Sequence, residues 1–181
     1  MAEPTVATLS DPLEGCSLAT AGISIVPLPL ARKISLRVPP ASVGAASAAF
    51  GVVLPTEPGR SARSGTRSAL WLGPDEWLII DENAEAAMPA GGLAGSIVDI
   101  SHRNRTIEIS GRLATATLAA GCPLDLSLQA FPVGKCTRTL FGKVDIILWR
   151  TGEETFRIDY WPSFSAYLFA YLSKAAQAAA W

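Results

Sequence analysis

The chain has 181 residues, of which 49% are hydrophobic and 17% are charged, and its formal net charge is −1. A near-neutral chain lacks the global field that would attract nucleic acid or an anionic membrane, so we expect neither as a partner. The length suits one domain with a real core or two small half-domains that share one, and the charge deficit predicts that a partner covers part of the surface.

Residues 1–30 are weakly patterned and contain Pro4, Pro12, Pro27 and Pro29, which oppose a long helix. We therefore expect an N-terminal arm over residues 1–30, without a signal peptide or a membrane span.

The three cysteines, Cys16, Cys122 and Cys136, include no C-x-x-C pair. An odd number of cysteines without such a pair argues against a disulfide framework and against a zinc site. The prediction is a cytoplasmic protein with free thiols.

The first half of the chain predicts a strand, a short helix and a hairpin. Apolar residues alternate with polar ones from Lys33 to Val38, and Ser42 begins a short helix that reaches Phe50. Residues 51–68 are expected to be a surface loop, whose arginines are either solvated or bind an anion: Arg60, Arg63 and Arg67. The stretch "ALWLGPDEWLII" then forms a hairpin around Gly73, Pro74 and Asp75, and residues 81–95 hold at most one helical turn.

The second half repeats this plan. Strands are predicted over residues 96–101, 106–109, 137–141, 144–149 and 156–160, and a helix follows the expected N-cap Ser110. A last helix starts near the N-cap Ser163, and its apolar stripe should cover a sheet. That stripe consists of Phe164, Tyr167, Leu168, Tyr171, Leu172 and Ala175.

This order predicts an α+β fold of two ferredoxin-like halves related by a pseudo-repeat of strand, helix and antiparallel strands. The halves are residues 31–95 and 96–181, which form a single domain, 31–181, after the arm.

The segment "VDISHRNRTIEISG", Val98 to Gly111, holds the only histidine of the chain. In an extended strand, Asp99 and Ser101 share one face and His102 lies on the other, which opposes a Ser-His-Asp triad. Two interpretations stay open: a strand-end turn whose cations pair with local acids, or a contact surface for a partner or an anion. No nucleotide-binding, metal-binding or catalytic motif is recognisable, so no catalytic, cofactor-binding or metal-binding residue is assigned.

Five segments together resemble a known family. They are "LWLGPDEWLI", "VDISHRNRTIEISG", "LAAGCPLDL", "FPVGKCTRTLFGKVDIILWRTG" and "FRIDYWPSFSAYLFAYL". The chain is similar, over residues 30–175, to the gamma subunit of heterotetrameric sarcosine oxidase. It is more distantly similar to the folate-binding domain of the glycine-cleavage aminomethyltransferase, although "LFGKVDIIL" lacks the loop around that enzyme's catalytic acid, so Asp145 is not given this role.

The resemblance implies a complex that demethylates sarcosine oxidatively to glycine, releases hydrogen peroxide and passes the one-carbon unit to tetrahydrofolate. In such complexes FAD, FMN, NAD and folate lie on the larger alpha and beta subunits, delta carries zinc, and gamma holds no cofactor. The chain is thus expected to be a non-catalytic assembly subunit that contacts alpha, beta and delta.

Candidate partner contacts, besides the arm, are Trp71, His102, Arg103, Arg105, Trp149 and Trp161. Two alternatives are a stand-alone folate-binding one-carbon transferase and a regulatory module that binds an anion at the arginine-rich loop.

Overall fold

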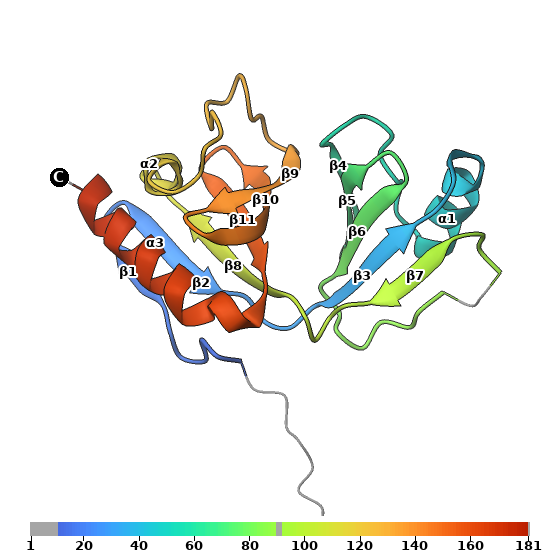
Figure 1. Ribbon diagram of the computed structural model, residues 1–181, viewed down its shortest axis with the longest axis horizontal. Coiled ribbons are helices and arrows are strands. Elements are labelled where there is room, and N and C mark those ends of the chain that lie inside the picture. Colours follow the sequence, from blue (N-terminus) through green and yellow to red (C-terminus); the bar gives the residue numbers. More distant parts are fainter. Residues whose placement is uncertain (1–10, 90–91, 181) are drawn as a thin grey trace, which may run out of the picture.

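The computed structural model describes residues 11–89 and 92–180, and within them two antiparallel sheets lie side by side (Figure 1). The strand order is β1-β2-β8-β11-β10-β9 in the six-stranded sheet and β4-β5-β6-β3-β7 in the five-stranded sheet. None of the helices in these ranges is long and apolar enough to cross a membrane.

The six-stranded sheet consists of β1 (Leu18–Thr20), β2 (Ile23–Pro27), β8 (Arg105–Ser110), β9 (Cys136–Phe141), β10 (Val144–Gly152) and β11 (Thr155–Tyr160). The five-stranded sheet consists of β3 (Arg32–Arg37), β4 (Ser61–Ser64), β5 (Arg67–Gly73), β6 (Glu76–Asp81) and β7 (Ser96–Asp99). The helices are α1 (Val43–Phe50), α2 (Ala114–Ala119) and α3 (Ser165–Ala179), with short 3-10 turns η1 (Pro40–Ser42) and η2 (Pro162–Phe164).

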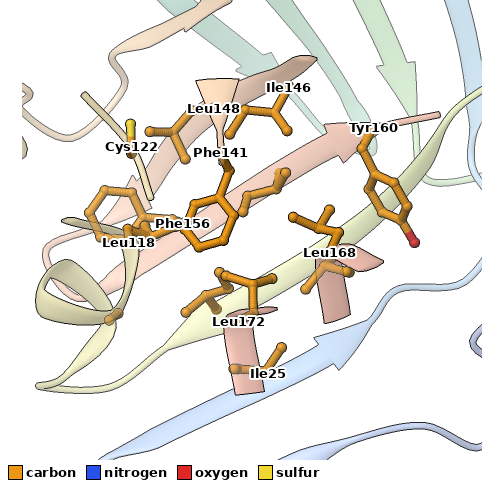
Figure 2. Close-up of a cluster of buried hydrophobic side chains, with 14 of the residues drawn as sticks. Ile25, Leu118, Cys122, Phe141, Ile146, Leu148, Phe156, Tyr160, Leu168 and Leu172 are labelled. Carbon is orange, nitrogen blue, oxygen red and sulfur yellow. The ribbon is translucent and has the colours of Figure 1, made fainter. Parts of the chain in front are cut away.

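The molecule has a helix–sheet–sheet–helix arrangement, because each sheet buries both of its faces. Figure 2 shows Leu168 and Leu172 of α3 in the same core as Phe141 and Phe156 of the six-stranded sheet. Helix α1 buries Phe50 against the outer face of the five-stranded sheet. The inner faces pack on each other through Leu70, Leu78, Ile80, Cys136 and Trp149.

A pseudo-two-fold axis relates the halves, because the strand order β2-β8-β11-β10-β9 of one sheet is matched by β7-β3-β6-β5-β4 in the other, and reciprocal hydrogen bonds join the halves. The Ser61 backbone N–H donates to the Gly134 carbonyl at 2.9 Å, and the Cys136 N–H donates to the Gly59 carbonyl at 2.8 Å. Between these bonds, Arg60 forms an antiparallel bridge with Lys135. The fold class predicted from sequence, α+β with two related halves, is therefore confirmed.

Each half gives its first strand to the sheet of the other half. Strand β2 precedes β3 in the chain but pairs with β8, and β7 precedes β8 but pairs with β3. The repeating unit consequently covers residues 23–81 in its first copy and residues 96–160 in its second. The additional elements are the strand β1, at the edge of the six-stranded sheet, and the helix α3, which packs on that sheet.

The predicted arm over residues 1–30 needs correction from residue 11 onward; residues 1–10 lie outside the described part. Residues 18–27 form β1 and β2, and Ile23 and Ile25 are buried in the main core. Pro27 is tolerated because it lies beyond the part of β2 that pairs with β1, which ends at Ile25.

Both predicted hairpins are confirmed, β5 with β6 and β9 with β10. The loop predicted over residues 51–68 contains a strand, β4, and residues 81–89 and 92–95 contain no helix. Ser42 is the N-cap residue of α1 as expected, although its side chain makes no capping hydrogen bond.

Two predicted N-caps, Ser110 and Ser163, are wrong. Ser110 is the last residue of β8, and Ser163 lies inside η2, which begins at Pro162. A proline fixes its own φ near the helical value and therefore suits the first position of a helical turn.

Candidate functional site

A cleft of about 620 Å³ lies between the inner faces of the two sheets. The five-stranded sheet contributes Ser35 and Glu76, and the segment that connects β7 to β8 contributes Ile100, Arg103 and Asn104. The six-stranded sheet and the residue after it contribute Arg138, Thr139, Leu140, Asp145, Ile146, Ile147, Asp159, Tyr160 and Trp161.

Glu76 joins the two sheets at one wall of the cleft. Arg138 Nη1 of β9 lies 3.1 Å from Glu76 Oε2, and Arg37 Nη2 of β3 lies 2.8 Å from the same oxygen. The hydrogen bond from Arg138 lowers the pKa of Glu76 below its ordinary value, and the charges of both arginines act in the same direction against the effect of burial. Glu76 is therefore an ionised group bound by two guanidinium groups.

A buried ion pair closes the floor of the cleft. Lys33 Nζ of β3 bonds to Asp159 Oδ1 of β11, and the two side chains are 3% and 2% exposed. Thr106 of β8 completes the group, since Lys33 Nζ lies 2.6 Å and Asp159 Oδ1 lies 3.1 Å from its Oγ1. Lys33 and Thr106 occupy equivalent positions in the two halves. Lys33 pairs with Ile80 of β6 and Thr106 pairs with Asp159 of β11, and each of these partners is the last residue but one of its strand.

Asp145 differs from the other acids of the cleft. It is exposed, lies across from Leu140 in the β9–β10 hairpin, and has no ion-pair or hydrogen-bond partner within residues 11–89 and 92–180. Leu140 and Trp161 are 43% and 45% exposed, and the Arg103 guanidinium lies 4.7 Å from the centre of the Trp161 ring. This end of the cleft thus offers apolar surface beside an unpaired carboxylate.

The histidine segment does not form a triad. Ser101 Oγ donates to Asp99 Oδ1 at 2.6 Å, which lowers the pKa of Asp99, and it accepts the Lys33 backbone N–H at 2.9 Å. The predicted extended strand ends at Asp99, so Ser101 contacts Asp99 because the chain turns there, and His102 is exposed in the same turn. Both interpretations of the segment stay open: residues 101–103 form a turn after β7 and Arg105 lies 3.9 Å from Asp11, while the exposed Arg103 lies over the Trp161 ring. Within the described ranges, no three His, Cys, Asp or Glu side chains are grouped as metal ligands.

The candidate contact residues separate into exposed and buried positions. His102, Arg103 and Trp161 are exposed, and Trp71 is half-buried against the outer core of the five-stranded sheet.

Trp149 and Arg105 do not offer free surface, contrary to expectation. Trp149 is 5% exposed, because the inner sheet face is covered by the other sheet, and its Nε1 donates to Ser61 Oγ at 2.8 Å. Arg105 is 3% exposed and lies 3.9 Å from Asp11, in the segment that was expected to be a free arm.

The loop arginines proposed as an anion site are paired with carboxylates. Arg60 pairs with Glu57 at 3.3 Å, Arg63 with Glu82 at 3.1 Å, and Arg67 with Asp81 at 2.6 Å. Arg67 is held by the buried Asp81, whereas Arg60 and Arg63 are about half exposed, so the anion-binding alternative stays a prediction.

Sequence reasoning missed the Lys33–Asp159 pair. The only available signal was a lysine and an aspartate within alternating strands, each on the face opposite the aliphatic residues. That pattern is also typical of a solvated sheet face, because a sequence does not show that a second sheet covers it.

Comparison with known proteins gives consistent matches along the chain. The model of the "Sarcosine oxidase, gamma subunit family" matches residues 37–178. A sarcosine oxidase subunit gamma from Arthrobacter sp is 34% identical over 149 residues, which cover 77% of this chain and 73% of that protein. The corresponding protein from Corynebacterium sp. (strain U-96) is 36% identical over 135 residues, with coverages of 70% and 65%.

Two solved structures resemble the fold. A chain of the heterotetrameric sarcosine oxidase from Corynebacterium sp. U-96, in complex with pyrrole 2-carboxylate, superposes with a TM-score of 0.81 and 30% identity, over 91% of this chain and 89% of that chain. The glycine cleavage system aminomethyltransferase T from Bartonella henselae has a TM-score of 0.64 and 14% identity, over 84% of this chain and 45% of that chain. At that identity, the second likeness concerns the fold alone.

Proposed function

The chain belongs to the sarcosine oxidase gamma subunit family, and from this membership we propose that it acts as a non-catalytic subunit that stabilises a heterotetrameric sarcosine oxidase. The observation that carries the proposal is the match to a chain of such a complex over 91% of the residues, which includes both sheets. A likeness this complete supports the same place in the same kind of assembly.

The engagement of the reactive side chains supports a non-catalytic role. The Cys136 thiol lies between the sheets, and desolvation by burial raises its pKa to about 12, so little reactive thiolate forms at neutral pH. Lys33 is held in an ion pair and Ser101 is bound to Asp99, so neither is available as a base or a nucleophile.

We infer that the partners are the alpha, beta and delta subunits, in the cytoplasm. FAD, FMN, NAD and tetrahydrofolate would then lie on alpha and beta, and this chain would contribute binding surface to the oxidative demethylation of sarcosine. Its low share of charged residues, 17%, agrees with a surface that a partner covers in part.

Co-expression of the four subunits tests the proposal. We expect the chain to co-purify with the others, and we expect its omission to lower the yield and thermal stability of the complex without removing flavin from the larger subunits. Sarcosine turnover by this chain alone, or a complex of unchanged mass and stability without it, would contradict the proposal.

One observation favours testing a second candidate, a folate-binding one-carbon transferase: Asp145 lines the cleft of an aminomethyltransferase-like fold. Calorimetric titration of the chain with tetrahydrofolate distinguishes the two. Micromolar binding that is lost in Asp145→Asn would favour the transferase, and we expect no binding heat.

A further inference from the structure

We propose that the open end of the cleft, formed by Arg103, Leu140, Asp145 and Trp161, is the docking site for an extended segment of another subunit. The segment would place an apolar side chain between Leu140 and Trp161 and a lysine or arginine against Asp145. This inference rests on the proposed role as a subunit, and it adds the surface and the chemistry of the contact.

The pseudo-two-fold axis relates the open end of the cleft to an equivalent position on the other side of the inter-sheet contact. Strand register places Glu108 and Arg157 of the six-stranded sheet at the positions of Ser35 and Leu78 of the five-stranded sheet. On the side of Glu108, Arg157 donates to Glu108 at 3.2 Å and to Glu82 at 3.0 Å. An ion network therefore fills one hollow.

The equivalent hollow on the other side is left open because its side chains are different. It has the short side chain of Ser35 where the closed hollow has Glu108. Trp161 follows the last residue of β11, and Glu82 follows the last residue of the equivalent strand, β6. The open hollow therefore has Trp161 at the position where the closed hollow has Glu82. No charged pair can span these positions, so the space is available to a side chain from outside the molecule.

The apolar residues at this opening are costly to leave in water. Leu140 and Trp161 are 43% and 45% exposed, and they flank one hollow instead of being scattered. Exposed apolar surface that borders polar groups in this way is typical of protein–protein contact sites. Arg103 stacks on Trp161 at 4.7 Å, which holds the ring in place and leaves guanidinium N–H groups to donate to a partner's carbonyls.

One carboxylate of the cleft, Asp145, calls for a cation on the occupant at its own position. Glu76 is neutralised by Arg138 and Arg37, and Asp159 is neutralised by Lys33. Asp145 is the acid of the cleft with no partner in the described ranges, so a basic side chain on the occupant complements it.

A protein segment suits the site better than a small ligand. Small-ligand sites commonly enclose about 70–90% of the ligand surface, whereas the apolar side chains here stand at an open rim. Strand β9 is moreover an edge strand that pairs with β10 alone from Thr137 to Phe141, so its outer side can hydrogen-bond to an extended backbone.

The test uses the complete complex, with the four subunits co-expressed and a tag on this chain. A photoreactive benzoylphenylalanine in place of Leu140 should crosslink to a peptide of a co-expressed subunit, identified by mass spectrometry, that contains a lysine or arginine. Asp145→Lys should lower the recovery of that subunit about tenfold, as expected for reversal of an interfacial charge, and Asp145→Asn should lower it less.

The matched control is Glu154→Lys, which makes the same charge reversal in the turn at the opposite end of the β10–β11 hairpin and should leave recovery unchanged. If the complex assembles and position 140 gives no intersubunit crosslink, or if Asp145→Lys equals the control, the docking site is wrong although the subunit role stands. A small molecule that is released from the wild-type complex but not from Asp145→Lys would also overturn it. If the wild-type chain recovers no other subunit, the subunit role itself fails.

Discussion

Removing one member of the Lys33–Asp159 pair should strongly destabilise the chain. Both side chains are almost fully buried, 3% and 2% exposed, at the contact between the two sheets. In Asp159→Asn, the Lys33 ammonium stays buried with neutral acceptors only, the Thr106 hydroxyl and the new amide oxygen. Breaking a buried pair in this way costs roughly 3–5 kcal/mol, since one charge is left without compensation.

The magnitude can be measured by urea or thermal unfolding followed by tryptophan fluorescence. For a chain of this size, about 1 kcal/mol shifts Tm by roughly 2–4 °C, so Asp159→Asn should lower Tm by about 6–20 °C. The control is Glu57→Gln, which removes the exposed pair with Arg60 at 3.3 Å and should cost under about 1 kcal/mol.

The double variant Lys33→Met/Asp159→Leu separates the pair from the packing around it. Replacing both charges by apolar groups removes the uncompensated charge, so the double variant should be within about 1–2 kcal/mol of wild type or more stable. Our reasoning about this pair is refuted if Asp159→Asn costs less than the Glu57→Gln control. It is also refuted if the double variant loses as much stability as the single variants Lys33→Met and Asp159→Leu lose together.

Three further predictions concern other parts of the fold. Arg138 lowers the pKa of Glu76, so the stabilisation from Glu76 is present above the ordinary pKa of 4.5. It is lost as the pH falls through the lowered pKa of the folded state. Glu76→Gln should therefore flatten the acid side of a pH–stability curve. Cys16 is exposed, whereas Cys136 is buried and has a pKa of about 12. A thiol reagent should therefore label Cys16 in the folded protein and Cys136 only on unfolding. Labelling of Cys136 in the folded protein would contradict its buried placement. Leu168→Ala should lower the free energy of unfolding by about 2–5 kcal/mol, because the side chain is fully buried in the main core. Denaturant unfolding measures this loss, and an equal loss in the exposed control Tyr167→Ala would count against burial as the reason.

Elements with local signals could be predicted from the sequence. The β5–β6 hairpin has apolar strands on either side of Gly73, Pro74 and Asp75, and Gly142 and Lys143 mark the bend between β9 and β10. These signals lie within a few neighbouring residues, so they survive in any tertiary context.

The sheet that a strand joins could not be predicted. The strand predicted over residues 96–101 forms over residues 96–99, and it pairs with β3 of the first half instead of joining β8 in the second. Residues 23–25 alternate apolar and polar side chains, but Val26 and Pro27 end the alternation, and the prolines around this segment favour an arm. Strand exchange between halves depends on contacts distant in sequence, which no local pattern contains.

The same limit applies to the candidate contacts. Trp149 and Arg105 were grouped with Trp161 because large aromatic and basic side chains in strands or turns are typical of contact surfaces. Trp149 instead lies between the sheets, and Arg105 lies near Asp11, whereas Trp161 is 45% exposed. The second sheet, which covers the inner face and leaves the residue after β11 uncovered, separates Trp149 from Trp161, whereas Arg105 lies on the opposite face of β8 near Asp11.

The two halves of the inter-sheet contact use charge in different ways, and this difference bears on assembly. On one side Arg157 binds Glu108 and Glu82, which satisfies the polar groups within the chain. On the other side the equivalent space is a cleft with exposed Trp161 and the unpaired Asp145. A repeated fold would otherwise offer two similar hollows, and a partner could dock at either. Because an internal ion network occupies one of them, the proposed docking site would give the chain one defined orientation in a heterotetramer.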